Sequence, residues 1–316
     1  MKGTLTPSKL ALISMIFGLL FVSALFAGCT QSTTSTPVTT AATTAPATEV
    51  ASTPMAAATT AVPTAIATTA TPAPTYTATE GNLVAYTAAS LSGVSPSLGK
   101  GFTNAYPGHK VVFNLDGTQA LKTQIENGAY ADVLISASNT YTNALKSENY
   151  LVNDSVKTLC TNYVIVILPA DNPAKIKSLA DLANPGVKIA MAANSVPVGT
   201  ATNTTITNLA KSTYGQDWKN ATYSNVVTYE TSEPAVATKV SLGEVDAGFV
   251  YQSTYTAAAS GTYQSITIPT KDNYLQTYTI AILKESSNKA VASEFEQYML
   301  STVGQQTLKD YGFTPY

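Results

Sequence analysis

Hydrophobic residues follow two different spacings between residues 82 and 160, and the two spacings predict strands and helices in turn. Short apolar runs predict strands at 83–86, 110–115 and 132–136. After each run, apolar residues recur three or four positions apart, which predicts helices at 91–105, 119–127 and 139–147. This repetition with short connections indicates an α/β fold whose sheet is mostly parallel, with right-handed crossovers.

A longer β-branched run, "TNYVIVILP" at 161–169, leads into a second series of the same kind. The pattern predicts strands at 187–192, 226–228, 247–251, 265–268 and 278–283, helices at 200–213 and 235–242, and two C-terminal helices at 289–300 and 303–311. Two such series joined by a strand-rich crossover predict two lobes with a ligand cleft between them. We expect lobe I to comprise residues 80–160 and 285–316, and lobe II residues 161–284.

The N-terminus has the pattern of a secretory signal peptide over residues 1–28. Lys2 and Lys9 are followed by an uncharged run at 10–27, and "FAGC" ends at Cys29. Small residues directly before a cysteine favour cleavage and lipidation at Cys29. A retained membrane anchor is the alternative, because the run is just long enough to span a bilayer. Both readings place the rest of the chain outside the cytoplasm.

Residues 29–79 consist almost entirely of Thr, Ala, Ser and Pro. Such a stretch has too little large apolar surface to offset the entropy of ordering its backbone, so we expect a disordered tether. Similar stalks also carry surface and adhesion proteins. The tether therefore indicates where the protein works and not what it does.

Composition removes several classes of function. The chain has no arginine, and 17 lysines face 19 acidic residues, which argues against a nucleic-acid surface and excludes the arginine fork as an anion clamp. His109 is the only histidine, and Cys160 is the only cysteine after Cys29. No nucleophile stands in register with a base, so we expect no enzyme and no cofactor, and we expect Asp132 to fix local backbone.

Candidate ligand contacts lie where strands end. In open parallel sheets, ligands bind at the carboxyl ends of strands, beside helix N-termini. Ser90, Thr118, the segment "NSVPVG" at 194–199 and Tyr251 occupy such places, and they offer neutral donors to an anion. Each also has a structural interpretation, because Ser and Thr are ordinary helix caps, a tyrosine often only packs, and Glu233 before Pro234 can cap a helix.

Five segments occur in the order seen in periplasmic molybdate-binding proteins of the ModA type. They are "YTAASLSG" (86–93), "QIENGAYADVLISAS" (124–138), "SVPVGTAT" (195–202), "LGEVDAGFVYQS" (242–253) and "YGFTP" (311–315). The chain resembles this family over about residues 82–316. The resemblance implies a two-lobed, type II periplasmic-binding-protein fold that closes like a flytrap on a tetrahedral oxyanion.

The resemblance also implies roles for five residues. Ser90 and Thr118 match hydroxyl and backbone donors, Val198 matches a backbone N–H donor, and Tyr251 matches a hydroxyl donor. Glu233 stands where most relatives use a backbone N–H, and we expect its side chain to turn away. In the archaeal subgroup a glutamate here ligates the metal together with an aspartate. Val196 occupies the place that matches that aspartate, so half of this ligand pair is missing. Direct ligation of the metal by Glu233 is therefore only the alternative to a side chain that turns away.

The sequence therefore predicts an extracytoplasmic receptor that captures molybdate or tungstate, the ligand rather than a cofactor. The partners implied by the resemblance are a membrane permease of an ABC transporter and its cytoplasmic ATPase. We expect a monomer, lipid-anchored to the outer face of the cell membrane. A receptor for another tetrahedral oxyanion such as sulfate is one alternative, and a tethered surface or adhesion lipoprotein is another. A lipoprotein hydrolase is disfavoured for want of catalytic groups.

Overall fold

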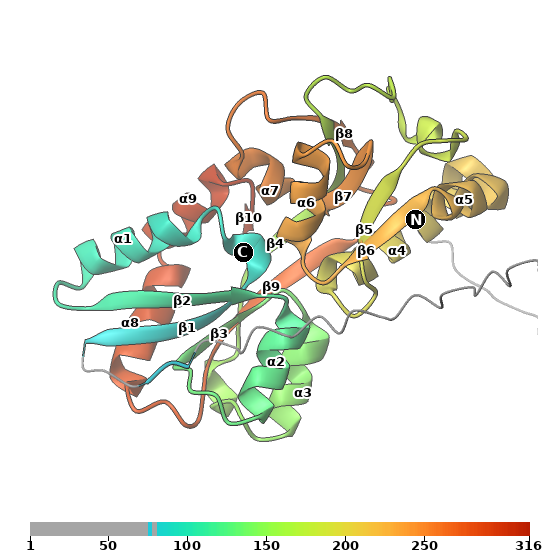
Figure 1. Cartoon of the computed structure of the whole chain (residues 1–316). Coiled ribbons are helices and arrows are strands. Elements are labelled where there is room, and N and C mark those ends of the chain that lie inside the picture. The colour runs from blue at the N-terminus through green and yellow to red at the C-terminus, as the bar shows by residue number, and fades with distance from the viewer. Residues whose placement is uncertain (1–74, 78–80) are drawn as a thin grey trace, which may run out of the picture. The chain divides into compact units, whose positions relative to one another are not determined.

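The computed structural model describes residues 75–77 and 81–316 (Figure 1). The predicted signal peptide, Cys29 and nearly all of the predicted tether lie outside these residues. Within the described part, no helix is both long and apolar enough to cross a lipid bilayer.

The strands of the first lobe combine parallel and antiparallel pairing. Strand β1 pairs in parallel with β2 and β3, β3 pairs antiparallel with β9, and β9 pairs antiparallel with the first half of β4. The short β10 also pairs with this half of β4. The bounds are β1 (Asn82–Ala88), β2 (Lys110–Asp116), β3 (Val133–Ser136), β4 (Lys157–Pro169), β9 (Leu275–Ile282) and β10 (Thr314–Pro315).

The second half of β4 continues into the second lobe. There β4 pairs antiparallel with β7 and β8, while β5 pairs in parallel with β7 and β6. The bounds are β5 (Ile189–Ala192), β6 (Val226–Glu230), β7 (Ala247–Tyr251) and β8 (Tyr263–Thr267). The molecule is thus two-lobed, as predicted, and β4 runs through both lobes.

Two sequence predictions need correction at the crossover. The sheet is mixed rather than mostly parallel, because the chain leaves the first lobe along β4 and returns along β9, so these neighbouring strands run in opposite directions. The predicted boundary also assigns residues 275–282 to lobe II. Their strand, β9, pairs on both sides with strands of the first lobe.

Helices flank the strands in both lobes (Figure 1). The first lobe contains η1 (Ala89–Leu91), α1 (Ser95–Ala105), α2 (Thr118–Glu126), α3 (Asn139–Ser147), η2 (Asn153–Ser155), α8 (Lys289–Leu300) and α9 (Thr302–Asp310). The second contains η3 (Leu179–Ala183), α4 (Pro197–Leu209), the π-helical η4 (Ala210–Tyr214), α5 (Gly215–Ser224), α6 (Glu233–Ser241) and α7 (Gln252–Ala257). The sequence pattern did not predict α5 or α7. Helix α5 buries only Trp218 and Thr222, and α7 is too short for a helical period to show.

The core explains why β1 reads as a continuous apolar run. Successive side chains of a strand point to opposite faces of the sheet. Leu83 and Ala85 pack in the larger hydrophobic cluster, which extends through both lobes. Val84 and Tyr86 pack in a second cluster with Leu121 of α2. Strand β1 is therefore buried on both faces, and its C-terminal end is held rigidly where the chain turns into η1.

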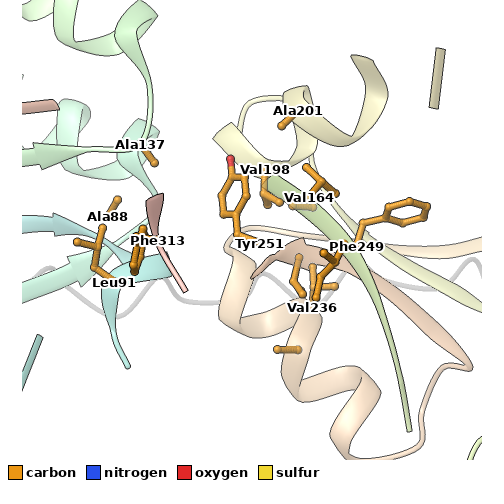
Figure 2. Close-up of a cluster of buried hydrophobic side chains, with 14 of the residues drawn as sticks. Ala88, Leu91, Ala137, Val164, Val198, Ala201, Val236, Phe249, Tyr251 and Phe313 are labelled. Atoms are coloured by element: carbon orange, nitrogen blue, oxygen red, sulfur yellow. The ribbon is translucent and has the colours of Figure 1, made fainter. Parts of the chain in front are cut away.

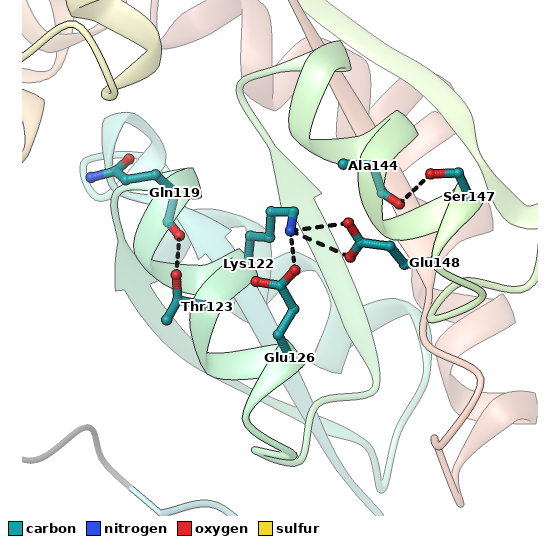
Figure 3. A network of polar contacts seen from close by, with 7 residues as sticks. All are labelled: Gln119, Lys122, Thr123, Glu126, Ala144, Ser147 and Glu148. Atoms are coloured by element: carbon teal, nitrogen blue, oxygen red, sulfur yellow. Dashed lines mark hydrogen bonds and ion pairs between the residues drawn. The ribbon is translucent and has the colours of Figure 1, made fainter.

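Helices α2 and α3 are also joined by charges at the surface (Figure 3). Lys122 of α2 bonds Glu126 one turn further along its own helix, and its Nζ lies 3.3 Å from the carboxylate of Glu148 at the end of α3. Pairs this exposed contribute at most about 1 kcal/mol each. The placement of α2 therefore depends mainly on the buried Leu121 and Ile125.

Candidate functional site

One pocket is lined by residues from the ends of strands in both lobes. All five site residues predicted in the sequence analysis line this pocket: Ser90, Thr118, Val198, Glu233 and Tyr251. Figure 2 shows Ala88 and Ala137 of the first lobe and Val198 and Tyr251 of the second, four of the lining residues. The cavity volume is about 20 Å³, slightly more than the roughly 10–15 Å³ that holds one water molecule. The pocket therefore suits a ligand of only a few atoms.

Ser90 does not cap a helix, contrary to one of its two predicted roles. It lies inside the short 3₁₀ helix η1, whose N-cap is Ala88, and α1 begins only at Ser95. The Ser90 hydroxyl instead lies 2.9 Å from the Tyr278 hydroxyl on β9. Either hydroxyl can donate in this pair, so Ser90 keeps a lone pair or a proton for a third partner.

Thr118 is the first residue of α2. The N-cap of that helix is Gly117, so Thr118, like Ser90, does not cap a helix. Its Oγ1 accepts a hydrogen bond from the backbone N–H of Ala137 at 3.1 Å. A hydroxyl oxygen that accepts still has its own proton to donate. The first backbone N–H that bonds into α2 is that of Ala120, to the carbonyl of Gly117. Both the hydroxyl proton and the backbone N–H of Thr118 are therefore available to a ligand.

Val198 presents its backbone at the start of α4. Pro197 occupies the first helical position and has no N–H, and the first N–H that bonds into the helix is that of Thr200, to the carbonyl of Val196 at 3.1 Å. The N–H groups of the first helical turn have no acceptor within the helix, and they carry a partial positive charge. The N–H of Val198 is such a group, in a residue that is 1% exposed.

Gly199 allows this helix start to approach β5 closely, and this gives a testable prediction. A Cβ at Gly199 would lie 2.1 Å from the carbonyl oxygen of Ala193 and 2.6 Å from that of Ala192. We expect Gly199→Ala to lower the free energy of unfolding by about 1–3 kcal/mol, because backbone atoms must move. Thr204→Ala, on the solvent side of α4, is the control and should stay within about 0.5 kcal/mol of wild type in urea unfolding. Equal stability of the two variants would contradict the close approach.

The Glu233 carboxyl is buried in the wall of the pocket. It is 3% exposed, and its Oε1 accepts hydrogen bonds from the backbone N–H of Tyr251 and the hydroxyl of Thr254, both at 2.7 Å. Ser232, not Glu233, is the N-cap of α6. The second carboxyl oxygen of Glu233, Oε2, is buried and has no hydrogen-bond partner in the described part of the chain. Burial raises the pKa of this carboxyl to about 7, against the lowering effect of its two hydrogen bonds.

Tyr251 lines the pocket, but its hydroxyl proton has a partner in this structure. The hydroxyl donates to Oε1 of Gln276 at 3.0 Å. The direction is settled by the other end of that amide, whose Nε2 donates to the carbonyl of Ala137 at 2.5 Å. Tyr251 can donate to a ligand only if this bond to Gln276 is exchanged.

The pocket combines neutral donors with a single carboxyl group. No lysine lines it. Among residues 75–77 and 81–316, no cluster of three or more His, Cys, Asp and Glu side chains could hold a metal ion. Val196 lines the pocket where a second carboxylate would be needed for direct ligation beside Glu233. The residues present favour recognition of an anion by hydrogen bonds over coordination of a bare cation.

Two important residues were not identified from the sequence. Gln276 and Tyr278 lie two positions apart on β9, hence on the same face of the sheet, and they hold the hydroxyls of Tyr251 and Ser90. They belong to an ordinary alternating strand, so no local motif marks them. To identify them, one would need to know how β9 is aligned with its neighbouring strands β3 and β4.

Two further hydrogen bonds join the lobes beside the pocket. The Gln119 side chain of α2 donates to the carbonyl of Thr231 at 2.9 Å. The Tyr141 hydroxyl of α3 donates to the carbonyl of Ser195 at 2.5 Å. Both connect helices of the first lobe to loops that precede helices of the second. The two lobes are therefore in contact at these two places.

Comparisons with known proteins agree with this geometry. The family profile described as "Bacterial extracellular solute-binding protein" matches residues 83–314. The chain is 31% identical over 234 residues to the molybdate-binding protein ModA of Mycobacterium tuberculosis, covering 73% of this chain and 84% of that one. It is 25% identical over 243 residues to ModA of Escherichia coli, covering 75% and 90%. The fold is similar to that of the periplasmic molybdate-binding protein of Azotobacter vinelandii, with a TM-score of 0.65, 22% identity, and coverage of 74% of this chain and 99% of that one.

Proposed function

This chain belongs to the bacterial extracellular solute-binding proteins, and on that premise we propose that it captures molybdate, and tungstate of the same shape, for an ABC transporter. The observation that carries the proposal is the convergence of Ser90, Thr118, Val198, Glu233 and Tyr251 on one small pocket. The relative from Mycobacterium tuberculosis, a molybdate-binding protein by name, supports this ligand.

Hydrogen bonds alone can supply the binding energy. Each hydrogen bond to a charged group is worth about 1.5–3 kcal/mol. The hydroxyl of Thr118, the hydroxyl pair of Ser90 and Tyr278, and the free N–H of Val198 provide several such bonds. Their sum can offset the dehydration of a small dianion without a lysine or an arginine.

Pocket size separates the proposed ligands from the alternatives. Sulfate has the charge of molybdate but is smaller, so fixed donors spaced for molybdate leave some of their bonds to sulfate long. A sulfate receptor remains the second candidate for the same pocket. A surface or adhesion role rests only on the Thr-rich segment 29–79 and does not account for the pocket.

We place the pocket outside the cytoplasm, tethered through residues 29–79 to a lipid on Cys29. The protein acts as a monomer, without a cofactor or catalytic activity. It releases its anion to a membrane permease coupled to a cytoplasmic ATPase.

Calorimetric titration of the purified protein with molybdate, tungstate, sulfate and phosphate tests the proposal. We expect saturable binding of molybdate and tungstate at about pH 6, and binding of sulfate that is weaker by at least about tenfold, or 1.4 kcal/mol. The absence of binding heat with all four anions would overturn the proposal. Tight binding of sulfate with none of molybdate would favour the second candidate.

Thr118 offers a matched pair of variants for the pocket itself. Thr118→Val removes the hydroxyl and keeps the shape, so molybdate should bind about 10- to 150-fold more weakly, the equivalent of one charged hydrogen bond. Thr118→Ser keeps the hydroxyl and should stay within a few-fold of wild type. If both variants bind alike, the hydroxyl does not contact the anion.

A further inference from the structure

An acid in the wall of an anion pocket needs an explanation. Glu233 is 3% exposed and lines the pocket proposed to hold a dianion. A carboxylate there would repel the ligand, and no lysine lines the pocket to offset its charge. The same group becomes a hydrogen-bond donor when it is protonated.

The hydrogen bonds around Glu233 settle which oxygen would carry the proton. A backbone N–H only donates, so Oε1, which receives the N–H of Tyr251 at 2.7 Å, is an acceptor. The Thr254 hydroxyl donates to this same oxygen. Oε2 has no partner within the described residues, although it is buried. A proton on Oε2 leaves both existing bonds intact and makes this oxygen an unused donor in a residue that lines the pocket.

The surroundings favour the neutral form. Burial raises the pKa of Glu233 to about 7 and raises the pKa of the nearby Tyr251 and Tyr278 well above the ordinary tyrosine value, so both phenols stay neutral. Lys239, on α6 itself, is paired with Glu244. The other ionisable side chains on elements that contact α6 or Glu233 do not line the pocket; they are Lys157, Cys160 and Tyr163 on β4, Tyr229 and Glu230 on β6, Tyr255 on α7, and Tyr263 on β8, whose hydroxyl donates to the carbonyl of Ala237 in α6.

We propose that Glu233 binds the oxyanion as a neutral carboxylic acid, donating its Oε2–H to an oxygen of the anion, so that capture above neutral pH takes up one proton from solvent. This inference rests on the proposed function and adds a proton requirement to it. The carboxyl stays protonated in the complex, and no covalent bond forms or breaks apart from this O–H. Discrimination follows, because an anion that brings its own proton would compete for the position that Oε2–H occupies.

Calorimetric titration with molybdate in two buffers of different ionisation enthalpy measures the proton count directly. Molybdate itself stays a dianion between about pH 6 and pH 9, so uptake reports the protein. We expect close to one proton taken up per molybdate at about pH 8 and close to none at about pH 6. Affinity should fall about tenfold for each pH unit above 7. Proton uptake near zero at both pH values, with molybdate bound, would overturn the inference and leave the proposed function standing.

Two variants separate Glu233 from other titrating groups. In Glu233→Gln the amide keeps an acceptor for Tyr251 and Thr254 and carries a permanent donor, so its affinity should not vary with pH and its proton uptake should vanish. Glu230→Gln alters a neighbouring carboxyl outside the pocket and should keep the pH profile of wild type. A pH profile in Glu233→Gln equal to that of wild type would assign the proton elsewhere and refute the inference. No binding of molybdate by wild type even at about pH 6 would instead refute the proposed function.

Discussion

Asp132→Ala should lower the free energy of unfolding by about 3–5 kcal/mol, the largest loss of stability expected here from a polar residue. Asp132 is 0% exposed, and its Oδ2 accepts the backbone N–H of Val84 at 2.8 Å. Its Oδ1 accepts the hydroxyls of Tyr130 and Ser286. Alanine would leave the N–H of Val84 and the hydroxyl of Ser286, both in residues that are 3% exposed, without this acceptor where water has little access. Urea denaturation with a two-state fit measures the loss.

Asp154→Ala provides the control for this first prediction. Asp154 is an exposed acid in η2, and its removal should change stability by no more than about 0.5 kcal/mol. A loss in Asp132→Ala no larger than in the control would show that water replaces the carboxylate. The contacts of Asp132 already support the expectation that it fixes local backbone.

The stability of the unliganded protein should fall with rising pH because of Glu233. The pKa of Glu233 is about 7 in the folded protein and 4.5 ordinarily. At pH values between these two pKa values, the folded state therefore binds more protons than the unfolded state. The stabilisation is complete below about pH 4.5 and is lost as pH rises through about 7. A difference of this size corresponds to about 3 kcal/mol.

The measurable quantity is the difference in unfolding free energy between wild type and Glu233→Gln, since other groups titrate equally in both. The variant should gain about 3 kcal/mol relative to wild type between about pH 4.5 and pH 8. Molybdate must be absent, because a bound anion changes the titration. Parallel stability profiles for the two proteins would mean that the buried carboxyl is solvated or paired when ionised.

Elements whose signals are local were predictable. Helix α3 has the predicted bounds, because the Ser138 side chain accepts the N–H of Tyr141 and so marks the start within a few residues. Helix α8 and strand β7 also have their predicted bounds. The predicted helix at 91–105 failed at its start, because the chain first makes the 3₁₀ turn η1 and then begins α1 at Ser95, just before Pro96.

Elements whose environment comes from distant segments were not predictable. Residues 275–282 were assigned to the second lobe, but their strand, β9, pairs with β3 and with the first half of β4, which belong to the first lobe. The capping role of Ser90 was wrong for the same kind of reason. Its partner Tyr278 is 188 positions away, and no spacing in the sequence connects them.

The sequence by itself determined which residues stand at the ends of strands, because hydrophobic periodicity and turn residues act over a few positions. Strand ends indicated Ser90, Thr118, the segment 194–199 and Tyr251, and the family resemblance singled out Val198 and Glu233. The structure brings all five residues to one pocket. Only the tertiary structure decided what each group can donate. The partners of Glu233 lie 18 and 21 positions away, and its burial, which sets its protonation, depends on packing between α6 and β7 that no local pattern encodes.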